Sequence, residues 1–148
     1  MSDEMVQSIA WRRDFATGVG IIDDQHRVLI NMLNDAAAKL TDQSTAEEIG
    51  RIVRGLLNYA DYHFKIEERL IEDHGYARER SADAGSHLRE HREFVAQVME
   101  VGQRLEQGKR VTRDELVTFL IGWLTNHILH SDKILGAFLL DKRIGGSR

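Results

Sequence analysis

Residues 59–76 read YADYHFKIEERLIEDHGY, and after a polar stretch residues 87–94 read HLREHREF. In the first segment His63 and Glu67 are four residues apart, and in the second His87 and His91 have the same spacing. On an α-helix that spacing places both members of a pair on one face, about one turn apart. Imidazole and carboxylate groups are good ligands for first-row transition metals. The two pairs therefore predict two neighbouring helices whose metal ligands point to one place.

The apolar periodicity around these motifs predicts an all-α protein. Apolar residues recur at helical spacing in four long segments, and the polar stretches between them are short. We therefore expect an up-down-up-down four-helix bundle. The expected parts are an extended N-terminal arm over about 1–22, helices over about 24–40, 46–74, 86–106 and 112–131, and a short terminal helix over about 133–140.

Start and stop signals support these boundaries. Side chains that accept a hydrogen bond from a free backbone N–H are typical of helix starts. The expected caps are, in chain order, Asp23 or Asp24, Ser44 or Thr45, and Thr112 with Glu115. Gly75 and Gly108 are expected to end the second and third helices, and the last residues, IGGSR, are expected to be loose.

Histidines on the apolar faces extend the ligand pattern to all four helices. A single histidine on such a face is more often an ordinary core residue, so the argument depends on the joint pattern. Buried, unpaired carboxylates would cost several kcal/mol each, and two shared dications would offset that cost. The candidate ligands are His26, His63, Glu67, His87, His91, His127 and Asp132, a set too large for one ion.

The spacing of His127 and Asp132 does not fit a regular helix. Five residues place the two side chains about 140° apart around the helix axis. Either the helix is distorted there, for example by a π-bulge, or Asp132 reaches the site from the last turn. We expect such an irregularity between Asn126 and Ile134.

Composition narrows the class of protein. The chain has 148 residues, a net charge of −4 and no cysteine or proline. That length predicts one domain, residues 1–148, and the mild acidity argues against nucleic-acid binding. The lack of cysteine excludes disulfides, iron–sulfur clusters and zinc–thiolate sites. Neither a membrane span nor a signal peptide is evident, so we expect a soluble, cytoplasmic protein without membrane insertion.

Four motifs in this order resemble the bacterial hemerythrins, and the resemblance covers almost the whole chain, from Trp11 to about Leu140. The arm and first ligand, W-x3-F-x2-G-V-x2-I-D-x-Q-H, span residues 11–26. The other motifs are H-x3-E at 63–67, H-x3-H at 87–91 and H-I-x3-D-K at 127–133. Two features depart from the family pattern. Ala77 follows Tyr76 where the family commonly has proline, and the segment before His87 is longer.

The resemblance implies a cofactor of two non-heme iron ions joined by a bridging oxo or hydroxo group. By this resemblance His87, His91 and His127 would hold one iron, and His26 and His63 the other, which keeps an open coordination position. Glu67 and Asp132 would bridge the two ions.

A dioxygen pocket is expected one turn before His127. Leu124 and Trp123 precede that histidine by three and four residues, and by resemblance Leu124 lines the pocket. Tyr59, Tyr62 and Ile66 flank His63 and are weaker candidates, for which plain bundle core is the better interpretation.

Reversible dioxygen binding, for storage, delivery or sensing, is the function that this resemblance predicts. Dioxygen is then the partner, any protein recipient is unspecified, and a monomer or weak oligomer without catalytic residues is expected. One alternative is a di-iron peroxidase, oxidase or nitric-oxide-handling enzyme, with Tyr59 or Tyr62 near the open iron. The His-x3-Glu order counts against the ferritin-like oxidases, which use Glu-x-x-His.

A second alternative is a structural or partner-binding bundle with an incidental metal ion. It predicts a large exposed apolar face, which the sequence does not show. Two further histidines are extra to the family pattern. His74 is expected at a helix end, with an accessory ligand or supporting group as the alternative, and His130 is expected beside the cluster or at the surface.

Overall fold

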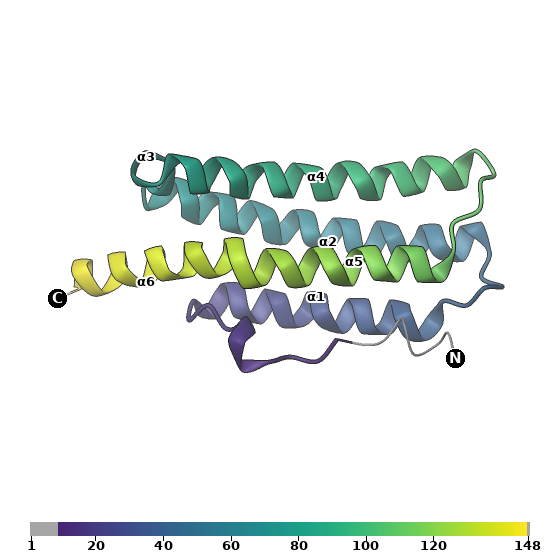
Figure 1. Ribbon diagram of the computed structural model, residues 1–148, viewed down its shortest axis with the longest axis horizontal. Helices are drawn as coiled ribbons and strands as arrows, with labels where there is room; N and C mark the ends of the chain where they lie inside the picture. The colour runs from purple at the N-terminus through teal and green to yellow at the C-terminus, as the bar shows by residue number, and fades with distance from the viewer. Residues whose placement is uncertain (1–8, 148) are drawn as a thin grey trace.

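The structure, a computed structural model, describes the backbone of residues 9–147 and the side chains of residues 9–142. Four long helical rods lie side by side and alternate in direction (Figure 1). They are formed by α1 (Gly20–Lys39), α2 (Ala46–Asp73), α4 (Ser81–Glu106) and α5 (Arg113–His127), the last continued by α6 (Lys133–Ser147). The predicted all-α, up-down-up-down bundle is confirmed. None of the helices in the described range is long and apolar enough to cross a membrane.

Reciprocal capping fixes the starts of α2 and α5 where the sequence predicts them. The Thr45 hydroxyl accepts from the Glu48 N–H at 3.1 Å, and the Glu48 carboxylate accepts from the Thr45 N–H at 2.8 Å. Thr112 and Glu115 form the same pair at 3.1 and 3.0 Å. Each box satisfies two backbone N–H donors that a bare helix start leaves free.

The predicted start of the first helix is wrong. Helix α1 begins at Gly20 without a side-chain cap, so neither Asp23 nor Asp24 is the N-cap. The Asp23 carboxylate instead accepts from the Thr17 N–H and hydroxyl, both at 2.8 Å, and from the Gly18 N–H at 3.1 Å. Asp23 therefore fixes the end of the arm from within the first helical turn.

The N-terminal arm is shorter than expected. Its described part covers residues 9–19 and contains one 3₁₀ turn, η2 (Arg13–Phe15), which places the Phe15 side chain fully in the core. Residues 1–8 of the predicted arm lie outside the described residues. In Figure 1 the arm runs alongside α1.

The predicted connection before the third helix, over about 75–85, contains a short helical turn, and the third helix starts at Ser81 rather than near residue 86. A single turn, α3 (Tyr76–Glu79), and the start of α4 at Ser81 occupy most of it. Short polar residues such as Ser81 resemble a loop in sequence, but Ala84 is buried one turn before His87 and keeps the helical period. Gly75, at φ 73°, turns the chain between α2 and α3, since glycine adopts positive φ without a steric cost.

The last two predicted helices are one continuous helix. Helix α5 passes through a π-helical turn, η3 (Ile128–Asp132), directly into α6. The irregularity expected between Asn126 and Ile134 is thus confirmed, whereas a separate helix ending near residue 140 and a loose tail are not. Apolar residues continue at helical spacing as far as Leu140, and with no proline to interrupt it the helix runs on to Ser147.

Two groups of buried apolar residues fill the interior, one on each side of a layer of polar side chains. The larger group, here the bundle core, includes Leu29, Ala60, Phe64, Phe94, Leu116, Leu120, Leu124 and Ile128. The smaller group, here the end core, contains Val19, Ile22, Ile71, Tyr76, Ala84, Leu135, Phe138 and Leu139. Each rod crosses the polar layer between the two groups; in α1, for example, Ile22 and Leu29 flank His26.

Candidate metal centre

The structure brings all seven predicted ligands into one buried layer, called here the polar layer. None of them is more than 3% exposed, and His26, Glu67, His87 and Asp132 are fully enclosed. The layer draws side chains from α1, α2 and α4 and from the junction between α5 and η3. Such a density of polar groups in the interior requires partners, because an unpaired buried charge is costly.

The five histidines divide into two groups around the two carboxylates. His87 and His91 direct Nε2 at Glu67 Oε1, at 3.1 and 3.0 Å. His87 and His127 direct Nε2 at Asp132 Oδ1, both at 3.2 Å. We call His87, His91 and His127 the three-histidine group.

The second oxygen of each carboxylate faces the other histidines. His63 Nε2 lies 3.1 Å from Glu67 Oε2, and His26 Nε2 lies 2.7 Å from Asp132 Oδ2. His26 and His63 are the two-histidine group. Glu67 and Asp132 thus each offer one oxygen to each group, the arrangement expected of two carboxylates that bridge a pair of metal ions.

The π-helical turn brings Asp132 into this layer. One turn of π-helix contains more residues than one turn of α-helix, so residues five apart come to the same side. His127 and Asp132, five apart in sequence, consequently meet at 3.2 Å. The regular helix α2 brings His63 and Glu67 together with a spacing of four residues.

The hydrogen bonding of the layer fits a set of cation ligands. Although His26 Nε2 and Asp132 Oδ2 are close, neither has a hydrogen-bond partner among the described residues, and the same holds for His63 Nε2, His127 Nε2 and Glu67 Oε2. Buried polar atoms in proteins are almost always satisfied. The candidate ligands form two four-residue subsets whose ligand atoms lie within 4.8 Å of one another. One subset is Glu67 with the three-histidine group, and the other is Glu67 and Asp132 with the two-histidine group.

The same contacts shift the pKa values of three of the imidazoles and of both carboxyls when no metal ion is bound. Burial opposes charge on His26 and His87, but Asp132 and Glu67 outweigh it and raise the pKa of each imidazole to about 9. His127 likewise has a pKa well above the usual range. Burial also opposes charge on Glu67 and Asp132, but the histidines hold the pKa of both carboxyls well below the usual range. A metal ion would therefore have to displace protons from this layer.

A second set of polar side chains contacts the outer nitrogens of the histidines. His63 Nδ1 lies 2.6 Å from Gln25 Oε1, His91 Nδ1 lies 3.0 Å from Glu68 Oε2, and His127 Nδ1 lies 2.5 Å from Glu90 Oε1. The sequence analysis missed these three residues. Their only signal was their place beside the ligands in the chain, since Gln25 and Glu68 directly adjoin His26 and Glu67, and Glu90 adjoins His91.

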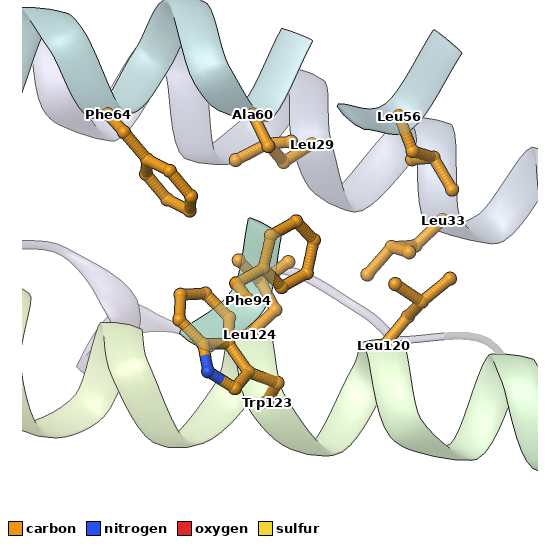
Figure 2. Close-up of a pocket in the computed structure, with 9 residues that line it drawn as sticks. All are labelled: Leu29, Leu33, Leu56, Ala60, Phe64, Phe94, Leu120, Trp123 and Leu124. Atoms are coloured by element: carbon orange, nitrogen blue, oxygen red, sulfur yellow. The ribbon is translucent and has the colours of Figure 1, made fainter. Parts of the chain in front are cut away.

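Two aromatic rings stack on ligands of the three-histidine group. Phe64 lies parallel to His91 at 3.9 Å between ring centroids, and Trp123 lies parallel to His127 at 4.6 Å. Both aromatic rings also line an enclosed apolar cavity of about 20 Å³ in the bundle core (Figure 2). The stacking holds the imidazole planes and covers the polar layer on the cavity side.

The cavity lies one helical turn from the polar layer and has only apolar walls. Its lining is Leu29, Leu33, Leu56, Ala60, Phe64, Phe94, Leu120, Trp123 and Leu124 (Figure 2). The two predicted pocket residues, Leu124 and Trp123, are on its wall, and their role toward dioxygen stays a prediction. Tyr59, Tyr62 and Ile66 are not among its lining residues, and the Tyr62 side chain points to solvent with 53% exposure.

The two remaining histidines lie outside the polar layer, as expected. His74 is partly exposed at the end of α2, and its Nδ1 is 3.1 Å from the Leu70 carbonyl oxygen. His130 is exposed, and its Nδ1 is 2.9 Å from the Asn126 carbonyl oxygen. Each ring thus contacts the backbone one turn earlier in its own helix.

Comparisons with known proteins agree with this geometry. Residues 17–139 match the family model described as the hemerythrin HHE cation binding domain. The chain is 34% identical to the bacteriohemerythrin of Stenotrophomonas maltophilia, over 84% of this chain and 77% of that protein, and 33% identical to that of Methylococcus capsulatus, over 85% and 92%. A crystal structure of wild-type hemerythrin superposes with a TM-score of 0.77 at 32% identity, over 88% of this chain and 97% of that one.

Proposed function

Because the chain belongs to the hemerythrin family, we propose that it binds dioxygen reversibly at a non-heme di-iron centre, for storage, delivery or sensing. The ligands in this proposal are the three-histidine group for one iron, the two-histidine group for the other, and Glu67 and Asp132 between them. When bound, the iron pair supplies the electrons with which dioxygen is held. The residues of the chain must hold the iron pair, provide a site for dioxygen and exclude water.

The observation that carries the proposal is the asymmetry of the ligand set beside an apolar cavity. Three imidazoles face one side of the shared carboxylates and two face the other, so the two-histidine side has room for one more ligand. Leu29 follows His26 by three residues and Ala60 precedes His63 by three, and both line the cavity. Phe64 and Trp123, which also line it, stack on His91 and His127, so the cavity borders both histidine groups. In this proposal a small apolar molecule in the cavity binds the iron of the two-histidine group, because only that iron has an open position.

Water exclusion is the second contribution of the chain. Apolar cavities of this kind stay dry because water finds no hydrogen-bond partners in them. Leu124, Trp123 and Phe64 line the cavity, and the Phe64 and Trp123 rings lie between it and His91 and His127 of the polar layer. Since water promotes irreversible oxidation of such centres, a dry wall favours release of intact dioxygen over turnover. The nine lining residues offer no acid that could protonate a bound oxidant, which favours binding over the peroxidase or oxidase alternative.

The test is anaerobic reconstitution with ferrous iron, metal analysis, and repeated cycles of air and argon while the visible spectrum is recorded. We expect two irons per chain and a colour that appears with oxygen and vanishes under argon. Two irons with a one-way change to a di-ferric spectrum would instead support a di-iron enzyme. Fewer than two irons per chain would show that the ligand assignment is wrong.

A further inference from the structure

The side chains outside the ligand set differ in charge between the two histidine groups. In the three-histidine group, His91 contacts Glu68 and His127 contacts Glu90. In the two-histidine group, His63 contacts the neutral amide of Gln25. The outer nitrogens of His26 and His87 have no hydrogen-bond partner among the described residues. Carboxylates thus contact the outer nitrogens of two histidines at one metal position, and of none at the other.

Glu68 and Glu90 are placed to act as anions. Their side chains are 41% and 31% exposed, so solvent supports the charge, whereas Gln25 is buried. Glu90 is further fixed by the Ser131 hydroxyl, which donates to Glu90 Oε1 at 2.7 Å. Ser131 belongs to the π-helical turn η3, so the turn that places Asp132 also holds the carboxylate behind His127.

A carboxylate behind a ligating histidine changes the ligand itself. With Nε2 on the metal, the imidazole carries its proton on Nδ1 and donates it to the carboxylate, which fixes the ring and makes Nε2 more basic. A more basic ligand binds a metal ion more tightly and favours its more highly charged state. An amide acceptor such as Gln25 orients the ring but brings no negative charge.

We propose that Glu68 and Glu90 make the two metal positions unequal, so that the ion held by His87, His91 and His127 binds more tightly and is stabilised in its ferric state relative to the other ion. The proposal rests on the ligand assignment in the proposed function. Reduction adds one electron from an external donor, and the Nδ1 proton stays on the imidazole throughout. Glu68 and Glu90 are therefore positioning residues that act through His91 and His127.

The experiment compares Glu68→Gln and Glu90→Gln with wild type by two measurements. The first is titration of the metal-free protein with Co²⁺, and the second is a mediated redox titration of the iron-loaded protein. We expect each variant to weaken one of the two Co²⁺ sites by about 10- to 100-fold and to leave the other unchanged. We also expect the ferric-to-ferrous ratio at a given potential to fall about tenfold, equivalent to about 59 mV for a one-electron couple.

Matched controls remove the same charge from the same helices. Glu72 on α2 and Glu93 on α4 are exposed, and Glu72→Gln and Glu93→Gln should leave both measurements at the wild-type values. Gln25→Glu tests the converse, because a carboxylate behind His63 should strengthen the weaker Co²⁺ site. Should the buried charge at residue 25 prevent folding, the variants at the partly exposed positions 68 and 90 still decide the question.

Three results would overturn the proposal. They are wild-type values in both Glu68→Gln and Glu90→Gln, equal weakening of both Co²⁺ sites, or the same shifts in the control variants. A wild-type protein that binds two metal ions but not dioxygen would refute the proposed function and leave this inference supported if the two sites respond as described. A wild-type protein that binds fewer than two metal ions would overturn both.

Discussion

The polar layer and the bundle core are equally buried, but they depend on different interactions. Glu67 is 0% exposed and Leu116 is 2% exposed, and both lie between the same rods. Leu116 is stabilised by burial of apolar area, at about 25 cal/mol per Å². Glu67 is destabilised by burial unless imidazoles and a cation compensate for the lost water. The bundle core is therefore self-sufficient, whereas the polar layer depends on what binds to it.

The two regions also place different demands on helix geometry. Apolar packing tolerates small rotations of a side chain around the helix, so regular α-helix serves for the bundle-core residues of the four rods, apart from Ile128 in η3. The polar layer needs specific atoms at specific points, and it coincides with the π-helical turn η3, the one departure from regular geometry within the described rods. The irregularity thus occurs where coordination, rather than packing, sets the requirement.

Glu67→Ala should have the largest effect on stability and metal binding, because it disrupts the polar layer. The substitution leaves His63, His87 and His91 without their shared carboxylate, and removal of one partner from a buried ion pair costs about 3–5 kcal/mol. We expect loss of at least one metal ion per chain as well, because metal binding is coupled to folding. Metal analysis and thermal unfolding measure the two effects. Glu72→Ala, exposed on the same helix, is the control, and two retained metal ions with an unchanged Tm would contradict the prediction.

Leu116→Ala should damage the bundle core and spare the polar layer. Leu116 lies three turns before His127 in α5 and is almost fully buried. Leucine-to-alanine changes in cores cost about 2–5 kcal/mol through lost contacts and a residual cavity. We expect that loss in chemical denaturation, together with two metal ions per chain. A loss of metal binding in this variant would show that the two regions are not independent.

Leu124→Asn should connect the two regions by bringing a polar group into the cavity. An unsatisfied buried amide costs about 1–3 kcal/mol, and it also gives water a partner next to the polar layer. We expect faster autoxidation of the oxygenated protein at unchanged iron content. The decay of the visible spectrum measures the autoxidation rate. Leu124→Met, which keeps an apolar side chain of similar volume, should show a smaller increase. An oxygenated form of Leu124→Asn that lasts as long as wild type would argue against the role of the wall.

The grouping of the candidate ligands could be predicted from sequence because helical spacing converts directly into a common face. His63 with Glu67 and His87 with His91 need only a regular helix. Asp132 is a different case, since its five-residue spacing from His127 fits no regular helix and predicted either a distorted helix or a reach from the last turn; the structure has the distortion, a π-turn. The apolar stripes likewise predicted the bundle, because four such stripes can be buried only against one another.

The outer partners of the histidines could not be predicted in this way. The chain has 24 acidic residues, and most glutamates on helices are simply solvated. Glu68 and Glu90 differ only because α2 packs against α4, and α4 against the junction of α5 and η3, at distances that bring a histidine within reach. The continuation of α5 into α6 was missed because the segments on either side of the irregularity were predicted as two helices, over about 112–131 and 133–140.

The smallest expected effect is on stability in a pH series without metal, which should affect the polar layer and not the bundle core. The raised pKa values of His26 and His87 stabilise the fold fully below the ordinary histidine value near 6.5, and this contribution is lost as pH rises through about 9. The lowered pKa values of Glu67 and Asp132 act oppositely, so their contribution is present above about pH 4 and is lost as pH falls. Maximum stability without metal is therefore expected between about pH 4.5 and 6.5.

The expected fall in Tm from pH 6.5 to 9 without metal is modest. The His87 and His127 ring centroids are 4.8 Å apart, and both rings have raised pKa values, so repulsion between these two imidazolium rings cancels much of the gain. A net loss of about 1 kcal/mol corresponds to about 2–4 °C in a chain of this size. With metal bound the trend should reverse between pH 5 and 8, because protons compete with the ion for the same nitrogens. Leu116→Ala should lower both Tm profiles without changing their slopes, since no group in the bundle core titrates, and a changed slope in that variant would show that the two regions are coupled.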